Sequence, residues 1–439
     1  MKFYLVGGYV RDRVLTQMGY QLQALEGELL SRDRDFVVVG GSIEEMLALD
    51  FQQVGASFPV FLHPDTKEEY ALARREVKTG DKHTDFGFDF SPDITLEEDA
   101  QRRDFTINAL YFDEASGEVL DPTWRGLQDC EDGILRHAGA GFAEDPLRAV
   151  RCARFAAQLG FRVAPETVSL IEDMVRDGML AHLSRERIDG EFTRAFSAEY
   201  DSALFLSYLR EWGALEQLYP ELERLFHCKE NLKYHHAGTT WGHVLAALGA
   251  VREQGPVVKT AIAYHDVYKH VAYAKRARTG RYVPHDDEAA LEYLRKFLSK
   301  RKFDSRTKAL CRLSVRYHMR MRLLFDGLKV RKWVEMIAAL SGGFREDYYQ
   351  QLVDFLEVCR ADELSDKTQS CFEGKGGRDR WKVLNSCALQ TYEVCSGIQA
   401  RDLPGYHDME VEQLKAGLLQ ARTAAVTQQV DFFARERSF

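Results

Sequence analysis

Apolar residues in the first 137 positions form short runs that predict strands, separated by helical patterns. The runs are rich in β-branched and aromatic residues, which pack well on a pleated sheet. The expected strands are residues 3–6, 36–39, 53–62, 69–75, 107–112 and 118–120. Helices are expected at residues 9–18 and 43–49, and a mobile loop at residues 78–93, where Gly, Asp and Lys are frequent.

From about residue 145 onward the pattern changes to one helix after another. Apolar residues recur three and four positions apart in residues 142–160, 165–177, 184–197 and 202–218. A Gly-rich polar stretch at residues 373–379 predicts a boundary before a last helical segment. The patterns together predict an α+β fold, in which a small mixed-sheet head is followed by an all-α body.

Charge narrows the classes of partner. A net charge of −9 on 439 residues argues against coating of nucleic acid by the whole surface. Residues 295–332 nevertheless contain fourteen Lys and Arg against two acids, Asp304 and Asp326. This segment is either a track for a phosphate backbone or a solvated helix face.

The cysteines and the N-terminus indicate a reducing compartment. The eight cysteines have no Cys-x-x-Cys spacing and stand singly among apolar residues, which predicts reduced, mostly buried thiols and no zinc ribbon. Met1 and Lys2 lead directly into the first strand, without an apolar leader or a cleavage site. We therefore expect a cytoplasmic protein with no membrane partner.

Two carboxylates stand at the start of the strand at residues 36–39. Side chains alternate along a strand, so Asp33 and Asp35 should lie on the same face, where two like charges are costly without a cation between them. Mg²⁺ held there favours attack on a nucleotide α-phosphate. Gly7 and Gly8 let backbone N–H groups approach a triphosphate, and Arg11 on the next helix can clamp it. Taken alone, a Gly-Gly pair after a strand is more often a plain turn, and an Asp-x-Asp sequence is more often a solvated turn.

In this order the features resemble the nucleotidyltransferases that add CCA to tRNA, a family that also contains bacterial poly(A) polymerases. Residues 102–108, Arg-Arg-Asp-Phe-Thr-Ile-Asn, match a family motif almost letter for letter. The resemblance implies that Asp33 and Asp35 are catalytic and hold Mg²⁺, and that Gly8, Arg11 and Arg103 bind the nucleotide. Residues 121–136 resemble the next family block, which we interpret as structural.

In the family, the block that residues 144–155 resemble is the protein template for the incoming base. The carboxylate of Asp145 can accept from the N4 amine of C or the N6 amine of A, and Arg148 can donate to N3 of C or N1 of A. U and G present their carbonyl and N–H groups in the reverse order, which leaves acceptor facing acceptor at a cost of several kcal/mol. Two side chains can therefore select C and A.

Three arginines recur at every third position of the same predicted helix. Arg148, Arg151 and Arg154 should lie along one side, where they repel each other without an anion, so we expect Arg151 and Arg154 to contact the triphosphate or the primer. Asp145 is expected to be the N-cap, with Pro146 at the first helical position. Residues 184–191 resemble the last family block, in which we expect a structural ion pair between Arg187 and Glu191.

A second set of candidate residues lies in the C-terminal half. His265 and Asp266 end the apolar run 260–264, where an ionised Asp needs a partner. Their surroundings resemble the HD phosphohydrolase domain, whose His…His-Asp…Asp ligands hold a divalent metal that activates water. The resemblance implies a site for a divalent transition metal such as Ni²⁺ or Mn²⁺, with the ligands His243, His265, Asp266 and Asp362 and the further candidates His285 and His318.

Some long CCA-adding enzymes carry such a domain with 2′,3′-cyclic phosphodiesterase, phosphatase and 2′-nucleotidase activities. This chain departs from that group: His-Asp-Leu-Gly-Lys is replaced by His-Asp-Val-Tyr-Lys at residues 265–269, and the His-rich loop is reduced to residues 285–288. Metal binding is therefore expected more firmly than hydrolysis.

The resemblance predicts four parts and one main activity. The parts are a nucleotidyltransferase head at residues 1–137, a helical neck at 138–225, an HD domain at 226–370 and a helical tail at 371–439. The expected activity is addition or repair of the tRNA 3′ CCA with CTP and ATP. One alternative is a poly(A) polymerase, although residues 54–62 resemble the CCA-adding form and a long basic tail is missing.

The other alternative is an HD phosphohydrolase or RNA-binding protein with an inactive polymerase site, against which the intact motifs speak. A protein that adds only CC or only A would have a similar sequence, but by resemblance the loop at residues 78–93 favours complete CCA addition. Residues 16–32 are an enlarged spacer before Asp33, in which this chain departs from the family.

Overall fold

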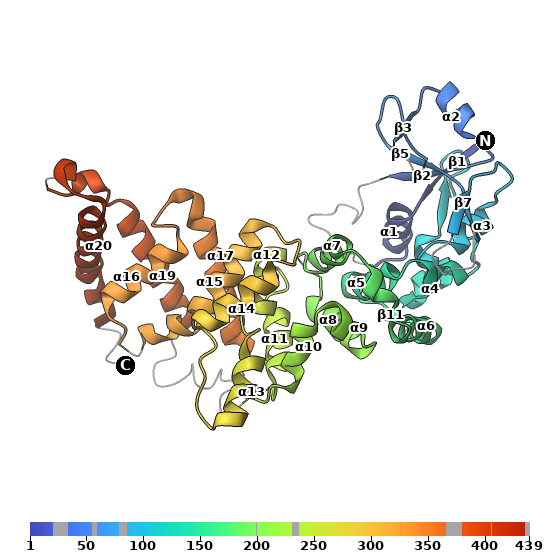
Figure 1. The fold of residues 1–439 in the computed structure, drawn as a ribbon. Helices are drawn as coiled ribbons and strands as arrows, with labels where there is room; N and C mark the ends of the chain where they lie inside the picture. The colour runs from blue at the N-terminus through green and yellow to red at the C-terminus, as the bar shows by residue number, and fades with distance from the viewer. Residues whose placement is uncertain are drawn as a thin grey trace. The chain divides into compact units, whose positions relative to one another are not determined.

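A computed structural model describes residues 1–20, 34–54, 59–78, 86–198, 200–230, 237–325, 327–365, 380–404 and 406–434. The chain divides into two compact units, each with its own core (Figure 1). The first unit is Met1–Glu191 with Leu204–Leu218, and the second is Phe192–Ala203 with Tyr219–Phe439. The finer division into four parts stays a prediction.

The first unit is built on a mixed sheet with the strand order β3-β4-β5-β2-β1-β8-β9 (Figure 1, blue to cyan). β1 pairs antiparallel with β2 and β8, whereas β2 pairs parallel with β5. The strands of this sheet are β1 (Lys2–Val6), β2 (Asp35–Val39), β3 (Gln52–Val54), β4 (Val60–Leu62), β5 (Glu69–Leu72), β8 (Tyr111–Asp113) and β9 (Glu118–Leu120). Two smaller sheets pair β6 (Arg75–Lys78) with β7 (Phe86–Asp89) and β10 (Ile134–Leu135) with β11 (Arg162–Val163).

Alternating side chains of the central strands build the core of this unit. Tyr4, Val6, Val37 and Tyr111 lie in one buried cluster with Ala100. The helices are α1 (Gly8–Gln17), α2 (Ile43–Ala48), α3 (Leu96–Gln101), α4 (Gly126–Asp132), α5 (Leu147–Leu159), α6 (Pro165–Arg176) and α9 (Ala214–Leu218). Capping boxes start α2 and α3, because a Ser or Thr and a Glu three residues later satisfy the first N–H groups of each helix.

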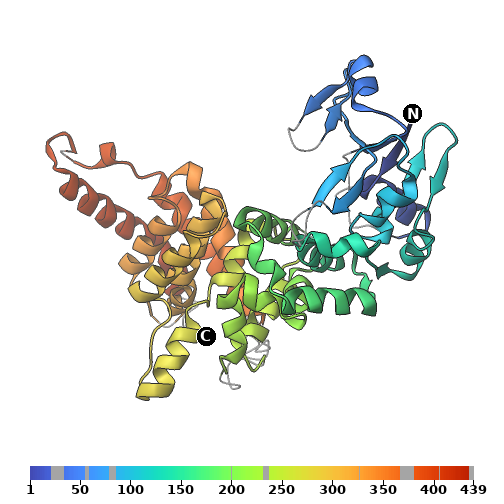
Figure 2. The same ribbon diagram turned by 45° about the vertical axis from the view of Figure 1, so that its right-hand side comes forward.

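The second unit is helical. Helix α12 packs against α15 and α17, and α11 packs against α17 (Figure 2, yellow-green to orange). Its helices are α10 (Pro220–Glu223), α11 (Thr240–Gly249), α12 (Pro256–Tyr264), α13 (Lys269–Thr279), α14 (Glu288–Leu298), α15 (Ser305–Met321), α16 (Val330–Leu340), α17 (Tyr349–Ser365), α19 (Arg380–Ser396) and α20 (Val411–Ala434). The segment from residue 185 to residue 211 carries α7 (Arg185–Ala195) and α8 (Ser202–Glu211).

The α+β class is confirmed, and most elements of the head lie where the sequence predicts them. The strand expected at residues 53–62 is wrong as a single strand, because β3 and β4 pair antiparallel with each other. The strand expected at 107–112 begins later, because residues 106–108 form a 3-10 turn. Residues 86–89 of the expected loop form β7, and residues 79–85 lie outside the described part of the chain.

Two of the expected helices are shorter than predicted. The helix expected at 142–160 begins at Leu147, after a 3-10 turn at residues 140–144. The helix expected at 202–218 is interrupted at Gly213, whose φ of +74° ends α8. The boundary expected at residues 373–379 lies outside the described residues.

The cysteines agree with the prediction of buried thiols. Seven of them are buried, and Cys371 lies outside the described part of the chain. Among the described helices, none is both long enough and apolar enough to span a membrane.

Candidate functional site

The turn that follows β1 lies beside the first candidate carboxylate. Gly7 has a φ of +79°, which favours glycine, and α1 begins at Gly8. Val6 and Asp35 are direct partners in the pair of β1 and β2, and a β-carbon built on Gly7 would lie 3.9 Å from Asp35 Oδ2. The structure thus brings the exposed Asp35 to the N-terminus of α1. Asp33 lies outside the described residues, so its pairing with Asp35 stays a prediction.

Arg11, in the first turns of α1, is buried rather than open to solvent. Its guanidinium donates to Asp12 Oδ1 at 2.7 Å and to Asn108 Oδ1 at 2.9 Å, and it lies 5.1 Å from the ring centre of Phe155. These contacts fix the guanidinium between α1, the 3-10 turn at 106–108 and α5. Its contact with a triphosphate stays a prediction.

Asp99 of α3 holds both arginines of the Arg-Arg-Asp motif. Its carboxylate accepts from Arg102 Nε at 2.9 Å, from Arg103 Nε at 3.0 Å and from the Tyr111 hydroxyl at 2.8 Å. Burial on its own would raise the pKa of Asp99, but the two guanidinium groups outweigh it and lower the pKa to about 2. Sequence reasoning missed Asp99, although its place three and four residues before the arginines was a signal. Nucleotide binding by Arg103 stays a prediction.

Asp104 is the counter-ion of Arg151. Its Oδ2 accepts from Arg151 Nη2 at 2.6 Å, and its Oδ1 accepts from Asn108 Nδ2 at 3.0 Å. Burial would raise the pKa of Asp104, yet Arg151 and the Asn108 amide lower it to about 2. The buried Asp104 therefore joins the motif at residues 102–108 to the half-buried Arg151 of α5 through a charge pair.

Glu191 of α7 is the counter-ion of Arg154. Both side chains are buried, and Arg154 Nε donates to Glu191 Oε2. The predicted pair of Arg187 with Glu191 is wrong: Arg187 instead donates to Asp145 Oδ2 at 2.7 Å. The physical reason is that a buried guanidinium needs a counter-ion far more than an exposed arginine needs a helix neighbour.

The two residues of the expected base template are each held by the protein. Asp145 Oδ1 accepts from the backbone N–H of Leu147 at 3.1 Å, and its Oδ2 pairs with Arg187. The N-cap is Pro146, one residue later than predicted. Arg148 donates to the carbonyls of Gly141 at 2.5 Å and Arg102 at 2.6 Å. Base reading by Asp145 and Arg148 stays a prediction.

The arginines of α5 therefore find their partners inside the protein. Arg151 pairs with Asp104, Arg154 pairs with Glu191, and Arg148 donates to carbonyls. The argument that these arginines need a bound anion to lie on one helix is wrong, because buried acids supply the charge. The assignment of Arg151 and Arg154 to the nucleotide remains a prediction without that argument.

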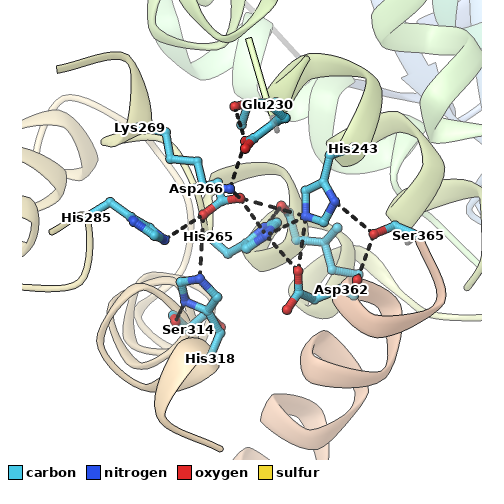
Figure 3. A network of polar contacts seen from close by, with 12 residues as sticks. Glu230, His243, His265, Asp266, Lys269, His285, Ser314, His318, Asp362 and Ser365 are labelled. Carbon is cyan, nitrogen blue, oxygen red and sulfur yellow. Dashed lines mark hydrogen bonds and ion pairs between the residues drawn. The ribbon is translucent and has the colours of Figure 1, made fainter. Parts of the chain in front are cut away.

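A cluster of imidazoles and carboxylates converges in the interior of the second unit (Figure 3). It brings together all the residues that the sequence singled out there: His243 of α11, His265 and Asp266 after α12, His285 before α14, His318 of α15 and Asp362 of α17. His243 Nε2 lies 3.0 Å from Asp362 Oδ1 and 3.3 Å from His265 Nε2. His265 Nε2 lies 3.3 Å from Asp266 Oδ2.

Asp266 lies between two sets of ligand atoms. His243 and His265 face its Oδ2, whereas its Oδ1 lies 3.4 Å from His285 Nε2 and 3.5 Å from His318 Nε2. Each set of three ligand atoms is compact enough for one metal ion. Asp266 Oδ1 and His285 Nε2 are buried without a hydrogen-bond partner in the described part of the chain. Such atoms are expected where a cation binds.

Outer hydrogen bonds orient the imidazoles of this cluster. Three histidines bond through Nδ1 to groups outside it and turn Nε2 toward Asp266, as metal ligands require. The pairs are His243 with Ser365 Oγ (2.8 Å), His265 with the Ile262 carbonyl (2.6 Å) and His318 with the Ser314 carbonyl (2.7 Å).

The electrostatics of the cluster favour a bound cation. Burial would lower the pKa of His265, but Asp266 and Asp362 outweigh it and raise the pKa to about 10. Burial would raise the pKa of Asp266, whereas Lys269 and His265 hold it well below its usual range. Lys269 Nζ, which sequence reasoning did not single out, lies 2.8 Å from both Asp266 Oδ2 and Glu230 Oε1. Imidazole and carboxylate donors together fit a divalent transition metal.

The basic segment 295–332 is not a continuous positive track. Several of its arginines pair with acids of the second unit, which favours the interpretation as an ordinary helix face. The pairs are Arg301 with Glu221 (2.8 Å), Arg306 with Asp354 (2.6 Å), Arg316 with Glu288 (2.9 Å) and Arg320 with Asp286 (3.4 Å).

The sequence matches two known families of domains. Residues 3–136 match the poly A polymerase head domain, and residues 160–226 match the probable RNA and SrmB-binding site of polymerase A. The multifunctional CCA protein of Teredinibacter turnerae is 40% identical over 368 residues, which are 82% of this chain and 84% of the relative. That of Hahella chejuensis is 40% identical over 410 residues, or 92% and 90%.

Solved structures share the fold at lower identity. The CCA-adding enzyme of Bacillus stearothermophilus in complex with CTP is 20% identical, with a TM-score of 0.58 over 97% of this chain and 89% of that chain. A CCA-adding enzyme in complex with ATP is 15% identical, with a TM-score of 0.58 over 97% and 85%. These likenesses extend over both units of the chain.

Proposed function

The chain belongs to the family of the multifunctional CCA proteins, and from this premise we propose that it builds or repairs the 3′ CCA end of tRNA with CTP and ATP. The relatives are named multifunctional CCA proteins, and the solved structures of the same fold are CCA-adding enzymes in complex with CTP or ATP. The proposal is supported in this chain by one observation above the others: the carboxylate of Asp35 lies against the glycine turn at the N-terminus of α1.

The reaction follows from this arrangement. The 3′-hydroxyl oxygen of the RNA attacks the α-phosphate of CTP or ATP, a new P–O bond forms, and pyrophosphate leaves with the electrons of the broken bond. Mg²⁺ held by Asp33 and Asp35 would activate that hydroxyl and neutralise the leaving group. The backbone N–H groups that begin α1 at Gly8 would receive the triphosphate, because a helix N-terminus attracts anions. Arg11 of α1 and Arg103, two residues after the end of α3, would support this binding.

Base choice falls to the start of α5 in this proposal. Asp145 would accept from the exocyclic amine of C or A, and Arg148 would donate to the adjacent ring nitrogen. The ion pair of Asp145 with Arg187 orients the carboxylate. Arg151 and Arg154 would add positive charge along the helix.

The test is incorporation on a tRNA that ends before its CCA, with Mg²⁺ and with CTP, ATP, both, or UTP and GTP. We expect addition that needs CTP and then ATP and stops after three nucleotides. Asp35→Ala should abolish addition, and Glu118→Ala is the matched control, because Glu118 is an exposed carboxylate on β9 of the same sheet. Long A tails would make the chain a poly(A) polymerase, and retained addition by Asp35→Ala would refute the metal assignment.

We further propose that the second unit is a metal-dependent phosphohydrolase of the HD class. The proposal is supported by the convergence of His243, His265, Asp266 and Asp362, with His285 and His318 on the other side of Asp266. A divalent transition metal bound there would supply an activated water for attack on a phosphoester. Lys269 beside Asp266 would keep that carboxylate ionised.

The test combines metal binding with hydrolysis. Calorimetric titration of the full chain with Ni²⁺ or Mn²⁺, and hydrolysis of a 2′,3′-cyclic nucleotide, should both be lost in Asp266→Asn. His270→Gln is the matched control, because His270 lies nearby but bonds to the Val267 carbonyl and Tyr293 instead of the cluster. Full hydrolysis by Asp266→Asn would contradict the assignment.

A further inference from the structure

Trp124 combines two properties that are costly together. It is 85% exposed, whereas Trp212, Trp241 and Trp333 are buried. Its backbone has a φ of +58°, a conformation that favours Gly or Asn and strains a bulky residue. A large apolar ring held in solvent on a strained backbone calls for an explanation outside the fold itself.

The loop that carries Trp124 is anchored on both sides. Asp121 accepts from the Thr123 hydroxyl at 2.7 Å and from the backbone N–H of Leu127 at 3.0 Å. The backbone N–H of Trp124 donates to the backbone carbonyl of Asp121 at 3.1 Å. Gly126 lies so close to the core that a β-carbon there would be 2.6 Å from the carbonyl oxygen of Thr106. The ring is therefore projected from a rigid loop, not from a flexible one.

The loop that carries Trp124 follows β9 and leaves the sheet at the same strand ends as the candidate catalytic residues. Leu120 pairs with Tyr111, Tyr111 with Val6, and Val6 with Asp35, so these residues form one row across β9, β8, β1 and β2. β9 and β1 run in the same direction. Both strands end at this row, so the segments that follow them leave the sheet on the same side. Three strand spacings separate Leu120 from Asp35, which is roughly 14 Å. Trp124 thus starts from the edge where nucleotide and RNA end must meet.

We propose that Trp124, with the exposed Arg125 beside it, is a stacking platform for an unpaired base of the RNA substrate, near the growing 3′ end. This inference rests on the proposed nucleotidyl transfer, and it names a contact of that site. An aromatic face accepts any base, and an adjacent guanidinium suits the neighbouring phosphate.

The surroundings favour RNA over a protein partner. A protein-binding patch is a contiguous apolar surface, but the exposed neighbours of Trp124, Arg125 and Gln128, are polar. A base needs only one ring face and one nearby cation. RNA binding would also explain why the strained backbone of Trp124 is kept. Asn or Gly would relieve the strain, but either residue would remove the aromatic ring that stacks on the base.

The test separates stacking from a structural role because one substitution should raise the stability of the protein and weaken its binding of tRNA. Trp124→Asn fits the left-handed backbone, so its Tm should rise by about 2 °C, while its Kd for a tRNA ending before CCA should weaken roughly 10-fold. Trp124→Phe should bind within about 3-fold of the wild type because it keeps an aromatic face. The matched control is Lys67→Asn, which relaxes another exposed residue with a φ of +61° and should leave tRNA binding nearly unchanged.

Tryptophan emission gives a readout that a structural role would not move. The tRNA should quench the solvent-exposed emission of the wild-type chain, and this quenching should be absent in Trp124→Phe. Wild-type quenching that survives in Trp124→Phe, or tRNA affinity that is unchanged in Trp124→Asn, would overturn the proposal. If the wild type adds no CTP or ATP, the proposed reaction fails, and the binding measurements still decide the stacking contact.

Discussion

Arg187 and Asp145 form an ion pair although 42 positions separate them in the sequence. The sequence pattern around each residue does not predict this partner. The pair joins the start of α7 to Asp145, two residues before α5, with 2.7 Å between Arg187 Nη2 and Asp145 Oδ2. Arg187 is thus a positioning residue in our proposal: it orients the carboxylate that reads the base and does not itself contact the base.

Removal of Arg187 should therefore relax base choice without stopping the reaction. In Arg187→Ala, the ratio of CTP to UTP incorporation should fall roughly 10-fold, because a misoriented acceptor loses about one hydrogen bond of discrimination. Incorporation of single nucleotides on tRNA measures this ratio. Arg176→Ala is the control, since Arg176 is exposed and pairs with a helix neighbour, Asp173. An unchanged ratio in Arg187→Ala would refute the positioning role.

Asp99 and Asp104 make the stability of the head depend on pH in the acid range. Each has a folded-state pKa of about 2, below its ordinary value. Their stabilisation is therefore complete above pH 4 and is lost as the pH falls from about 4 toward 2, because protonation then favours the unfolded chain. Each group should contribute roughly 2 kcal/mol. Hydrogen exchange of the β1 amides between pH 6 and 3 should detect this loss, and Asp99→Asn should flatten the slope; an equal slope in that variant would contradict it.

At the scale of elements, α5 is held to its surroundings by ion pairs with buried acids as well as by apolar packing. Arg151 and Arg154 face Asp104 and Glu191, so the helix is clamped from the motif at 102–108 and from α7. Periodicity predicted the helix and its arginines, but it could not say which acids would neutralise them, because both partners lie far away in the sequence.

Loss of the Glu191 carboxylate should destabilise the first unit strongly. In Glu191→Gln the Arg154 guanidinium keeps its charge in a buried place, which costs about 3 kcal/mol. The exposed pair of Asp173 with Arg176 offers the control, because Asp173→Asn should change the free energy of unfolding by less than about 0.5 kcal/mol. Protection of the α5 amides from hydrogen exchange measures both variants. Equal protection in the two would show that the buried pair contributes nothing.

At the scale of the whole molecule, the two candidate sites lie in different compact units. Asp35 belongs to the first unit, and the cluster around Asp266 belongs entirely to the second. We therefore expect the activities to separate: Asp35→Ala should lose nucleotide addition and keep phosphoester hydrolysis, and Asp266→Asn should do the reverse. Both assays on both full-length variants test this expectation. Loss of both activities in either variant, with its fold intact by circular dichroism, would show that the units depend on each other.

The sequence by itself determined the fold class and the main elements, and it proposed the candidate residues of both sites except Asp99 and Lys269. Local signals carry this information: short β-branched and aromatic runs for β1 and β2, periodicity for α5 and α6, and the family motifs at residues 102–108 and 144–155. The signals were weakest where a short turn replaces a regular element, as at residues 106–108 and at Gly213.

Only the tertiary structure decided the partners. It paired Arg187 with Asp145 and Arg154 with Glu191, assigned Asp99 to two arginines, and set Asp266 between two groups of histidines. The physical reason is that a buried charge takes the nearest opposite charge in space, and nearness in space depends on packing that local patterns do not contain.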